Sequence, residues 1–356
     1  MTAFINFSDV SKSYGNVTVV EGLNLEVAKG EFLSLLGPSG SGKTTILMLL
    51  AGFEAVTSGE IVLDGQKVNH LPPHRRGMGV VFQNYALFPH MSVAENVAFP
   101  LEMRKVPKAE IKERVRKALD RVHLAHLGDR KPAQLSGGQQ QRVALTRALV
   151  FEPKVILMDE PLGALDKQLR EHMQLEIREL HRRLGLTIVF VTHDQSEALT
   201  MSDRIAIFNK GEIAQIGTAD EVYDRPQNRF VSQFIGETNL LEGAVVGDGG
   251  AGDGHVAIEL EGGHRIRALA PARPLQGKAV VSLRPERVRL DAMKADGNAI
   301  SATIDDVVYQ GDHLRLHLSA GGLKLVARAE RGGPDRQPGQ TVELSFSAAD
   351  CSVFPA

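Results

Sequence analysis

The amino-acid sequence predicts an α/β domain with a largely parallel sheet, followed by a small all-β domain. From residue 1 to about 238, short β-branched runs alternate with helical periods, which is the pattern of an α/β fold. After that point, glycine-rich breaks at 247–254, 262–263 and 321–322 separate short alternating strands. A chain of 356 residues is also long enough for two domains with separate cores. We therefore expect domains over residues 1–238 and 239–356.

Four strands are expected in the first domain, at 31–36, 79–82, 155–158 and 187–191. The third and fourth are almost wholly apolar and show no alternation, so we expect them at the centre of the sheet, covered on both faces. Each of the four strands leads directly into a polar motif.

Three helices are predicted from apolar residues spaced three and four positions apart, which places them on one buried face. The longest is expected to end at Gly185, because glycine readily adopts the left-handed conformation of a C-cap. The apolar residues are Ile46, Leu49, Leu50 and Phe53 in the first helix, Ile111, Val115, Leu119 and Val122 in the second, and Leu165, Leu169, Met173, Ile177, Leu180 and Leu184 in the third.

Two segments of the second domain are predicted to be strands. One is VSLRPERVRL at 281–290, and the other is the run at 314–328, which we expect to fold into a hairpin about Ala320, Gly321 and Gly322.

Composition and charge exclude several functional classes. The formal net charge is -2, so the chain has no overall positive field to collect nucleic acid, and we expect no nucleic-acid partner. No apolar run approaches the roughly 18 to 20 residues that cross a bilayer, and the N-terminus does not resemble a signal peptide, so we expect the chain not to enter the membrane. Cys351 is the only cysteine, which excludes an internal disulfide and a multi-cysteine metal site.

The segment GPSGSGKT at 37–44 fits the pattern of a phosphate-binding loop between a strand and a helix. Its glycines let backbone N–H groups turn toward the phosphates, and the helix N-terminus adds a positive dipole. Lys43 would reach the β and γ phosphates, and the Thr44 hydroxyl would ligate magnesium. The residues expected to bind nucleotide here are Gly37, Pro38, Ser39, Gly40, Ser41, Gly42, Lys43, Thr44 and Thr45.

Two adjacent carboxylates, Asp159 and Glu160, end the predicted strand at 155–158. Ligands bind at this edge of open α/β sheets. Asp159 can hold magnesium, and Glu160 can accept a proton from an attacking water. His193 follows the next core strand, so we expect it beside Glu160. The alternatives are that the acids only cap the next turn and that the histidine is incidental.

A second glycine-rich segment, LSGGQQQR at 135–142, precedes a predicted helix. Ser136, Gly137 and Gly138 would expose a hydroxyl and unhindered N–H groups at the helix start, which makes a second anion-binding surface in one chain. The alternative is a structural cap followed by a flexible turn.

Together, these motifs make the first 238 or so residues resemble the ATPase subunits of ABC transporters. The resemblance implies a mixed, mainly parallel sheet with a helical subdomain, and hydrolysis of ATP with Mg²⁺. It also implies a head-to-tail homodimer, in which each ATP lies between the phosphate loop of one chain and Ser136 and Gly138 of the other. The matching motifs are the loop at 37–44, Gln83 in VVFQN, LSGGQ at 135–139, ILMDEP at 156–161, the turn at 165–166 and His193.

The resemblance also implies a role for each matching residue. Tyr14 would stack on adenine, Gln83 would sense magnesium and water, and His193 would contact the γ phosphate. Thr44, Gln83 and Asp159 would be the magnesium ligands. The implied catalytic residues are Lys43, Gln83, Glu160 and His193, and the implied nucleotide contacts outside the phosphate loop are Tyr14, Gln83, Ser136, Gly137, Gly138, Gln139 and Asp159.

One departure from the family pattern occurs in GALD at 163–166, where many members have serine in place of Gly163. This departure affects the hydrogen bonds that the resemblance implies across the dimer interface at this turn.

The segment at 84–101 matches the stretch that docks the membrane subunits of ABC transporters. The resemblance implies two integral-membrane permease subunits, an indirect solute-binding partner, and a peripheral location at the cytoplasmic face of the inner membrane. The alternative is that Leu87, Phe88 and Met91 are ordinary local core residues.

The second domain resembles the oligonucleotide-binding-like (TOBE) barrel of importer ATPases of the maltose, polyamine and iron type, on the strength of SLRPERVRL at 282–290. FIGETNLLEG at 234–243 and the segment at 84–101 favour the polyamine branch, for putrescine or spermidine. Import of sugar or ferric iron is an alternative function within transport. A soluble ABC ATPase and a ligand sensor are alternatives of another class. The barrel would either sense a ligand or extend the dimer interface.

Overall fold

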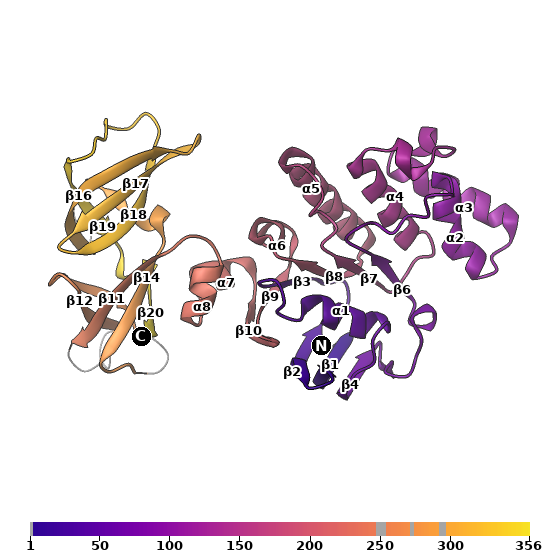
Figure 1. Cartoon of the computed structure of the whole chain (residues 1–356), viewed down its shortest axis with the longest axis horizontal. Helices are drawn as coiled ribbons and strands as arrows, with labels where there is room; N and C mark the ends of the chain where they lie inside the picture. Colours follow the sequence, from indigo (N-terminus) through magenta and orange to yellow (C-terminus); the bar gives the residue numbers. More distant parts are fainter. Residues whose placement is uncertain (1–2, 247–253, 271–273, 292–296) are drawn as a thin grey trace. The chain divides into compact units, whose positions relative to one another are not determined.

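The computed structural model describes residues 3–246, 254–270, 274–291 and 297–356 (Figure 1). They form two compact units, Met1–Ala219 and Asp220–Ala356. The glycine-rich segment expected to break the second domain lies, at 247–253, outside the described residues.

A six-stranded sheet forms the centre of the first unit, in the order β10-β9-β3-β8-β7-β6. All neighbouring pairs are parallel except β9 and β10. Every residue of β3 (Phe32–Leu36), β7 (Val155–Asp159) and β8 (Thr187–Thr192) is buried, which confirms the mainly parallel sheet and the coverage of its central strands. The remaining strands are β6 (Met78–Val81), β9 (Arg204–Asn209) and β10 (Glu212–Gly217).

A second, antiparallel sheet of the same unit was not expected from the sequence. Its order is β2-β1-β4-β5, and the pairing of β1 with β2 shifts register three times, which blurs the alternation that would reveal these strands. The strands are β1 (Ile5–Tyr14), β2 (Val17–Val27), β4 (Ser58–Leu63) and β5 (Gln66–Lys67).

Helix α1 (Lys43–Ala51) shares one hydrophobic core with both sheets. The expectation that Phe53 belongs to its buried face is wrong. The left-handed Gly52 donates its N–H to the Met48 carbonyl and ends the helix, and Phe53 is 52% exposed beside Phe82.

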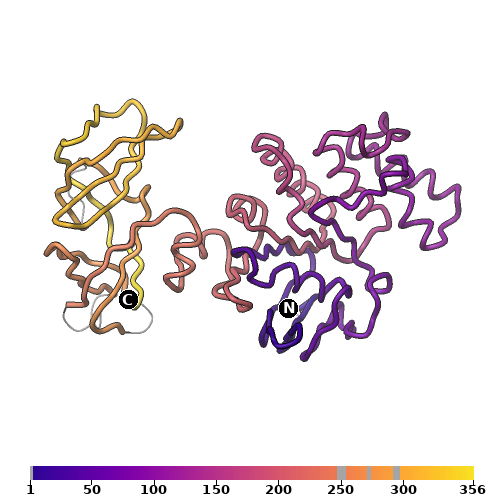
Figure 2. The backbone as a smooth tube through the Cα atoms, in the orientation of Figure 1, coloured from indigo at the N-terminus to yellow at the C-terminus, as the bar shows by residue number. Residues whose placement is uncertain are grey.

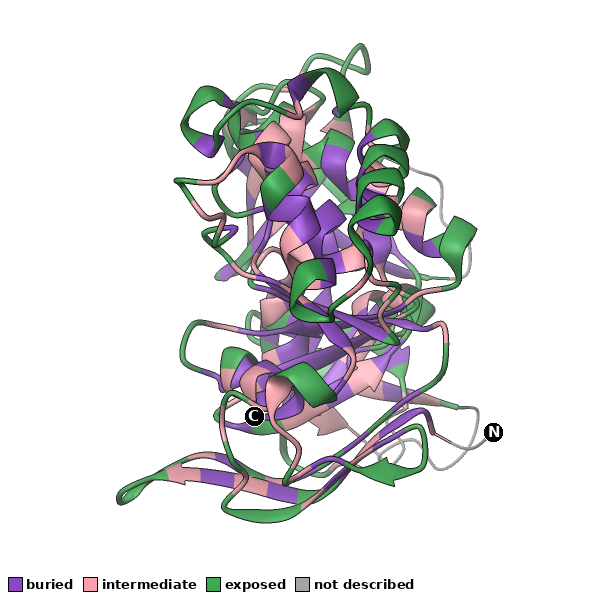
Figure 3. Cartoon of the chain, turned by 90° about the vertical axis from the view of Figure 1, so that its right-hand side faces the viewer, coloured by how far each residue is buried: buried purple, intermediate pink, exposed green. Residues whose placement is uncertain are grey.

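Five more helices belong to the first unit: α2 (Val93–Met103), α3 (Lys108–Arg121), α4 (Gly137–Leu149), α5 (Lys167–Leu184) and α6 (Gln195–Met201). Helices α2, α3 and α4 share a core that contains no sheet residue, and this is the helical subdomain implied by the resemblance. Helices α4 and α5 also pack on the parallel sheet. In Figure 3, buried residues gather along the sheet and the inner helix faces, and exposed residues lie on the outer turns.

The predicted buried faces of α3 and α5 are confirmed over most of their length. Gly185 is the left-handed C-cap expected after α5. The ends differ, because Val122 is the half-buried cap of α3, Leu165 is buried but precedes α5, and Leu184 is 42% exposed in the last turn.

The second unit has two five-stranded antiparallel sheets around one core, which gives the small barrel-like β domain expected. The chain runs through one sheet and then the other, and returns to the first with its last strand (Figure 2). The first sheet contains β11 (Asn239–Val246), β12 (His255–Leu260), β13 (Arg265–Leu269), β14 (Lys278–Leu283) and β20 (Cys351–Pro355); the second contains β15 (Arg289–Leu290), β16 (Asn298–Tyr309), β17 (His313–Ala320), β18 (Leu323–Glu330) and β19 (Thr341–Phe346).

The expected hairpin is confirmed, because β17 and β18 are joined by Gly321 and Gly322, both with positive φ. A continuous strand over 281–290 is wrong. β14 ends at Leu283, and Pro285, which has no N–H to donate to a sheet, begins a short 3₁₀ turn before β15.

Buried Arg284 ties the helical start of the second unit to its β sheets. Its guanidinium donates to the carbonyls of Tyr223, Ser232 and Glu237 and lies 4.4 Å over the Tyr223 ring. Those carbonyls belong to α7 (Ala219–Asp224), to α8 (Arg229–Phe234) and to the segment after it. The compact unit thus begins before residue 238, where the sequence changes in composition.

Replacing Arg284 by alanine is expected to lower the opening free energy of this segment by about 2 kcal/mol or more, because three carbonyls lose a charged donor. Hydrogen exchange of the α8 and β14 amides in the full chain measures this loss of opening free energy. Arg287, whose side chain is 47% exposed and pairs with Asp224, is the control; its alanine variant should lose less than about 1 kcal/mol. Equal losses in the two variants would contradict the role of Arg284.

Candidate functional site

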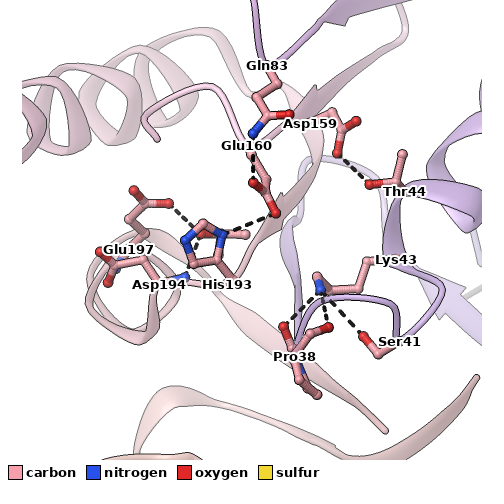
Figure 4. Close-up of polar contacts among 12 residues, drawn as sticks. Pro38, Ser41, Lys43, Thr44, Gln83, Asp159, Glu160, His193, Asp194 and Glu197 are labelled. Carbon is pink, nitrogen blue, oxygen red and sulfur yellow. Dashed lines mark hydrogen bonds and ion pairs between the residues drawn. The ribbon is translucent and has the colours of Figure 1, made fainter. Parts of the chain in front are cut away.

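The polar residues predicted from the sequence meet at one edge of the parallel sheet (Figure 4). The phosphate loop follows β3, Gln83 follows β6, Asp159 and Glu160 end β7, and His193 follows β8. The carboxyl ends of parallel strands share an edge, so the topology itself brings these segments together.

Backbone geometry explains the glycines of the phosphate loop. Gly40 and Gly42 have φ of 79° and 94°, a region that strains other residues. A Cβ at Gly37 would lie 2.5 Å from the Phe208 carbonyl oxygen. Gly42 is also the N-cap of α1 and has no side chain to bond the first-turn N–H groups. Those N–H groups therefore remain available to an anion.

Lys43 is the first residue of α1, at the end of this loop, and it is 5% exposed. Its ammonium donates to the carbonyls of Gly37 and Pro38 at 2.8 and 2.9 Å. Burial lowers the pKa of Lys43, and the charges of Glu160 and Asp159 oppose that shift. The site thus places one cation between the loop and two acids.

Asp159 and Thr44 form a pair of oxygen ligands beside the lysine. The Thr44 hydroxyl donates to Asp159 Oδ1 at 3.0 Å. Burial raises the pKa of Asp159, and the negative charge of Glu160 raises it further, whereas the Thr44 hydrogen bond and Lys43 lower it. A cation beside this carboxylate would offset the cost of its burial.

Glu160 is held on both sides of its carboxylate. Gln83 Nε2 donates to Oε2 at 3.1 Å, and His193 Nδ1 lies 3.2 Å from Oε1. The backbone of Glu160 has φ of 44°, a strained value for a residue other than glycine, and its N–H donates to the Val191 carbonyl of β8. Strain of this kind persists where the surrounding structure fixes it, and it is frequent at functional sites.

Comparisons with known proteins agree with this geometry. The family model described as ABC transporter matches residues 20–163, and the TOBE domain model matches residues 281–354. A spermidine/putrescine import ATP-binding protein of Rubrobacter xylanophilus is 48% identical over 98% of this chain and 93% of its own length. The chain belongs to the ABC transporter family. A protein of the same name from Thermobifida fusca is 51% identical over 86% of this chain and 81% of its own length.

Solved structures of ABC transporter cassettes support the same assignment. The dimeric structure of the cassette MJ0796 matches with a TM-score of 0.55 and 36% identity, over 60% of this chain and 98% of that one. A post-hydrolysis state of MJ0796 bound to ADP and Pi matches with 34% identity over the same shares of the two chains. This chain is therefore an ABC transporter ATPase, a protein that binds ATP.

The segment predicted to form a second anion-binding surface lies at the start of α4. Ser136 is the N-cap: its hydroxyl accepts from the Gln139 N–H, and Gln139 Oε1 accepts from the Ser136 N–H. A Cβ at Gly138 would lie 2.9 Å from the Leu169 side chain, so a larger residue here would require that side chain to move. Among the described residues, no hydrogen bond joins Ser136 or Gln139 to the loop at 37–44.

Two further residues of the ABC ATPase bear on the site. Tyr14 ends β1 and is 45% exposed, with the Lys12 ammonium 4.6 Å from its ring centre. Arg170 bonds the residue next to His193 and was missed by sequence reasoning. No motif marks it, because Arg170 lies 24 positions before Asp194 in the sequence.

Neither a membrane-spanning helix nor a metal-binding cluster occurs in the part of the chain that the structure describes. No helix there is long and apolar enough to cross a bilayer. No group of three or more His, Cys, Asp or Glu side chains is arranged there to hold a metal ion. A magnesium ion with few protein ligands usually completes its shell with waters and substrate phosphates.

Proposed function

We propose that this chain is the ATP-hydrolysing subunit that energises an importer of polyamines such as putrescine and spermidine. The observation that carries the solute assignment is the near full-length similarity to the Rubrobacter xylanophilus spermidine/putrescine import protein. Two relatives of the same name, from Roseobacter denitrificans and Ruegeria pomeroyi, are 46% identical over 97% and 99% of this chain. Import of sugar or ferric iron is the second candidate function. The uptake assay described below distinguishes it from polyamine import.

The proposed hydrolysis uses the residues at the sheet edge. The loop N–H groups and Lys43 bind the phosphates of ATP and neutralise the charge that develops on them. Glu160 accepts the proton of the attacking water, and Gln83 and His193 orient its carboxylate. In the complete site, His193 also contacts the γ phosphate, and Tyr14 stacks on adenine.

Mg²⁺ fits the oxygen ligands of this site. The Thr44 and Asp159 oxygens lie 3.0 Å apart, and carboxylate and hydroxyl oxygens are ligands that this hard cation accepts. Thr44, Asp159 and the Gln83 amide oxygen would hold it. When bound, it supplies positive charge to the phosphate oxygens.

The proposed functional unit is a head-to-tail homodimer. Each chain has one phosphate loop and one exposed Ser136 cap, and these do not bond each other among the described residues. In the dimer, each ATP contacts the loop of one chain and residues 136–139 of the other. The dimeric cassette MJ0796 is a precedent for pairing of such chains. We assign nucleotide binding to residues 1–238, and dimer contact or regulation to residues 239–356.

We place the contact with two permease subunits at residues 84–101. Half-buried Phe88 and Met91 lie in a loop whose backbone is held by fully buried Asn96: the Asn96 amide accepts from the Phe88 N–H and donates to the carbonyls of Phe88 and Met91. The loop thus presents apolar side chains on a fixed backbone. The permeases would hold the chain at the cytoplasmic face of the inner membrane, where it serves a solute-binding protein indirectly.

Deleting this subunit is expected to reduce polyamine uptake to background. Uptake of radiolabelled putrescine, spermidine, maltose and ferric iron would be compared in cells with and without the gene. The parental gene should restore polyamine uptake, and a gene with Glu160→Gln should not. If polyamine uptake were unchanged while maltose or iron uptake was lost, the subunit would instead serve the import of sugar or ferric iron.

A further inference from the structure

Arg170, near the start of α5, bonds two segments that both adjoin Glu160. Its Nη2 donates to the Leu165 carbonyl at 3.0 Å, and its Nη1 donates to Asp194 Oδ2 at 2.9 Å. Leu165 lies in the turn that follows Glu160, and Asp194 is the residue after His193. One side chain therefore connects the turn after β7 with the turn after β8.

The turn at 163–166, after Glu160, begins with two exposed residues that have little or no side chain. Gly163 and Ala164 are exposed, whereas Leu165 is buried. The Gly163 N–H donates to the Glu160 carbonyl at 3.3 Å, so the turn begins on the backbone of Glu160 itself. Because Gly163 has no side chain, a contact made at this residue acts on the rest of the site through the backbone and the hydrogen bonds that the backbone accepts. The Leu165 carbonyl is one of these, and Arg170 is its donor.

The turn that contains His193 is held by its two neighbours. The Thr192 hydroxyl accepts from the Asp194 N–H at 2.9 Å and donates to Glu197 Oε2 at 2.5 Å. Asp194 Oδ1 accepts from the Ser196 N–H at 2.8 Å and so caps α6. Figure 4 shows Asp194 and Glu197 beside His193, whose ring faces Glu160. The position of the ring therefore depends on where these two acids are fixed.

The charge of Arg170 belongs to this same cluster. Glu197 is 2% exposed, and an acid buried this deeply needs a counter-charge or hydrogen bonds. Arg170 Nε lies 3.9 Å from Glu197 Oε1 and is buried without a hydrogen-bond partner among the described residues. The arginine is thus the cation of a cluster with two carboxylates.

We propose that Arg170 is a positioning residue that couples the exposed turn at 163–166 to His193, and through His193 to the Glu160 carboxylate. Pressure on the turn, such as the approach of a second copy of this chain, moves the Leu165 carbonyl and with it Arg170 and Asp194. Hydrolysis then depends on the state of the turn. This inference rests on the roles proposed above for Glu160 and His193.

The chain offers a matched control on the same helix. Arg178 Nη1 donates to the Thr200 carbonyl at the other end of α6, so it also ties α5 to α6 but contacts neither the turn nor Asp194. Arg170→Gln is expected to lower kcat for ATP roughly 10- to 100-fold with KM within about twofold, since binding residues are untouched and only the geometry of the reacting groups changes. Arg178→Gln should keep kcat within about twofold.

A second pair of variants separates positioning from folding. Arg170→Lys keeps the charge near Asp194 and should recover part of the loss, and thermal melting would verify that each variant is folded. Asp194→Asn keeps the helix cap but not the charge, so it should also lower kcat. The double variant Arg170→Gln with Asp194→Asn should be no slower than the slower single one, because both remove the same link.

These results would be read from phosphate release by the purified full-length chain with ATP and Mg²⁺. Parental kcat in Arg170→Gln, an equal loss in Arg178→Gln, or losses that multiply in the double variant would overturn the proposal. Glu160→Gln tests the underlying site separately. If Glu160→Gln hydrolysed ATP at the parental rate, the roles proposed for Glu160 and His193 would be wrong. If only the arginine variants behaved against expectation, the coupling through Arg170 alone would be wrong.

Discussion

Glu160→Gln is expected to lower ATP hydrolysis by about 100- to 10,000-fold while ATP binding is retained, because that is the usual contribution of a positioned general base. Glutamine has the shape of glutamate but cannot accept the proton of the attacking water. Its amide can still bond Gln83, so the local structure should persist. Removing the negative charge of Glu160 near the phosphates should favour the bound anion. A closed, ATP-containing dimer should therefore accumulate.

Two measurements on the same preparation check this expectation. Phosphate release gives the turnover, and size-exclusion chromatography with and without ATP and Mg²⁺ gives the fraction of dimer. Glu171→Gln, an exposed carboxylate on α5, is the control and should behave as the parental chain. Hydrolysis by Glu160→Gln at the parental rate would remove Glu160 from its role.

Lys43→Ala and Ser136→Glu should each lose ATP hydrolysis by roughly 100-fold or more, for opposite electrostatic reasons. Lys43→Ala removes the buried cation at the centre of the phosphate loop. Ser136→Glu places a carboxylate at the start of α4, where the dimer would bring the γ phosphate. In a homodimer of either variant, both nucleotide sites are damaged. Their hydrolysis should therefore be near background.

Nucleotide retention and phosphate release by each purified variant test this pair. Lys67→Ala is the matched control for charge, because Lys67 is an exposed lysine that pairs with Glu60 away from the loop. If the Ser136→Glu chain hydrolysed ATP as fast as the Lys67→Ala chain, α4 would have no part in the reaction.

The centre of the fold and the position of the candidate site could be predicted because their signals are local in sequence. The strands β7 and β8 are short apolar runs that need burial on both faces, and each ends in the polar residues that its motif requires. Because β7 and β8 are parallel neighbours in the sheet, Glu160 and His193 follow at the same edge, and their side chains lie 3.2 Å apart.

Features that depend on tertiary contacts could not be predicted in this way. The register shifts of β1 hide its alternation. The end of α1 before Phe53 is different, because Gly52 is a local C-cap signal in the sequence. Arg170 is one of several arginines on a polar helix face, and only the folded chain brings it to Leu165 and Asp194. The interruption at Pro285 is different, because proline is a local signal against a continuous strand.

A mixed dimer of Lys43→Ala and Ser136→Glu chains tests the shared nucleotide site most directly. In it, the Lys43→Ala chain supplies its intact Ser136 to the intact Lys43 of the other chain, which restores one complete site and concentrates both changes in the second. The measurement is nucleotide retained by separately tagged, co-purified chains. The account predicts one ATP per mixed dimer and almost none in either homodimer of variants. A mixed dimer that retains no more nucleotide than those homodimers would contradict it.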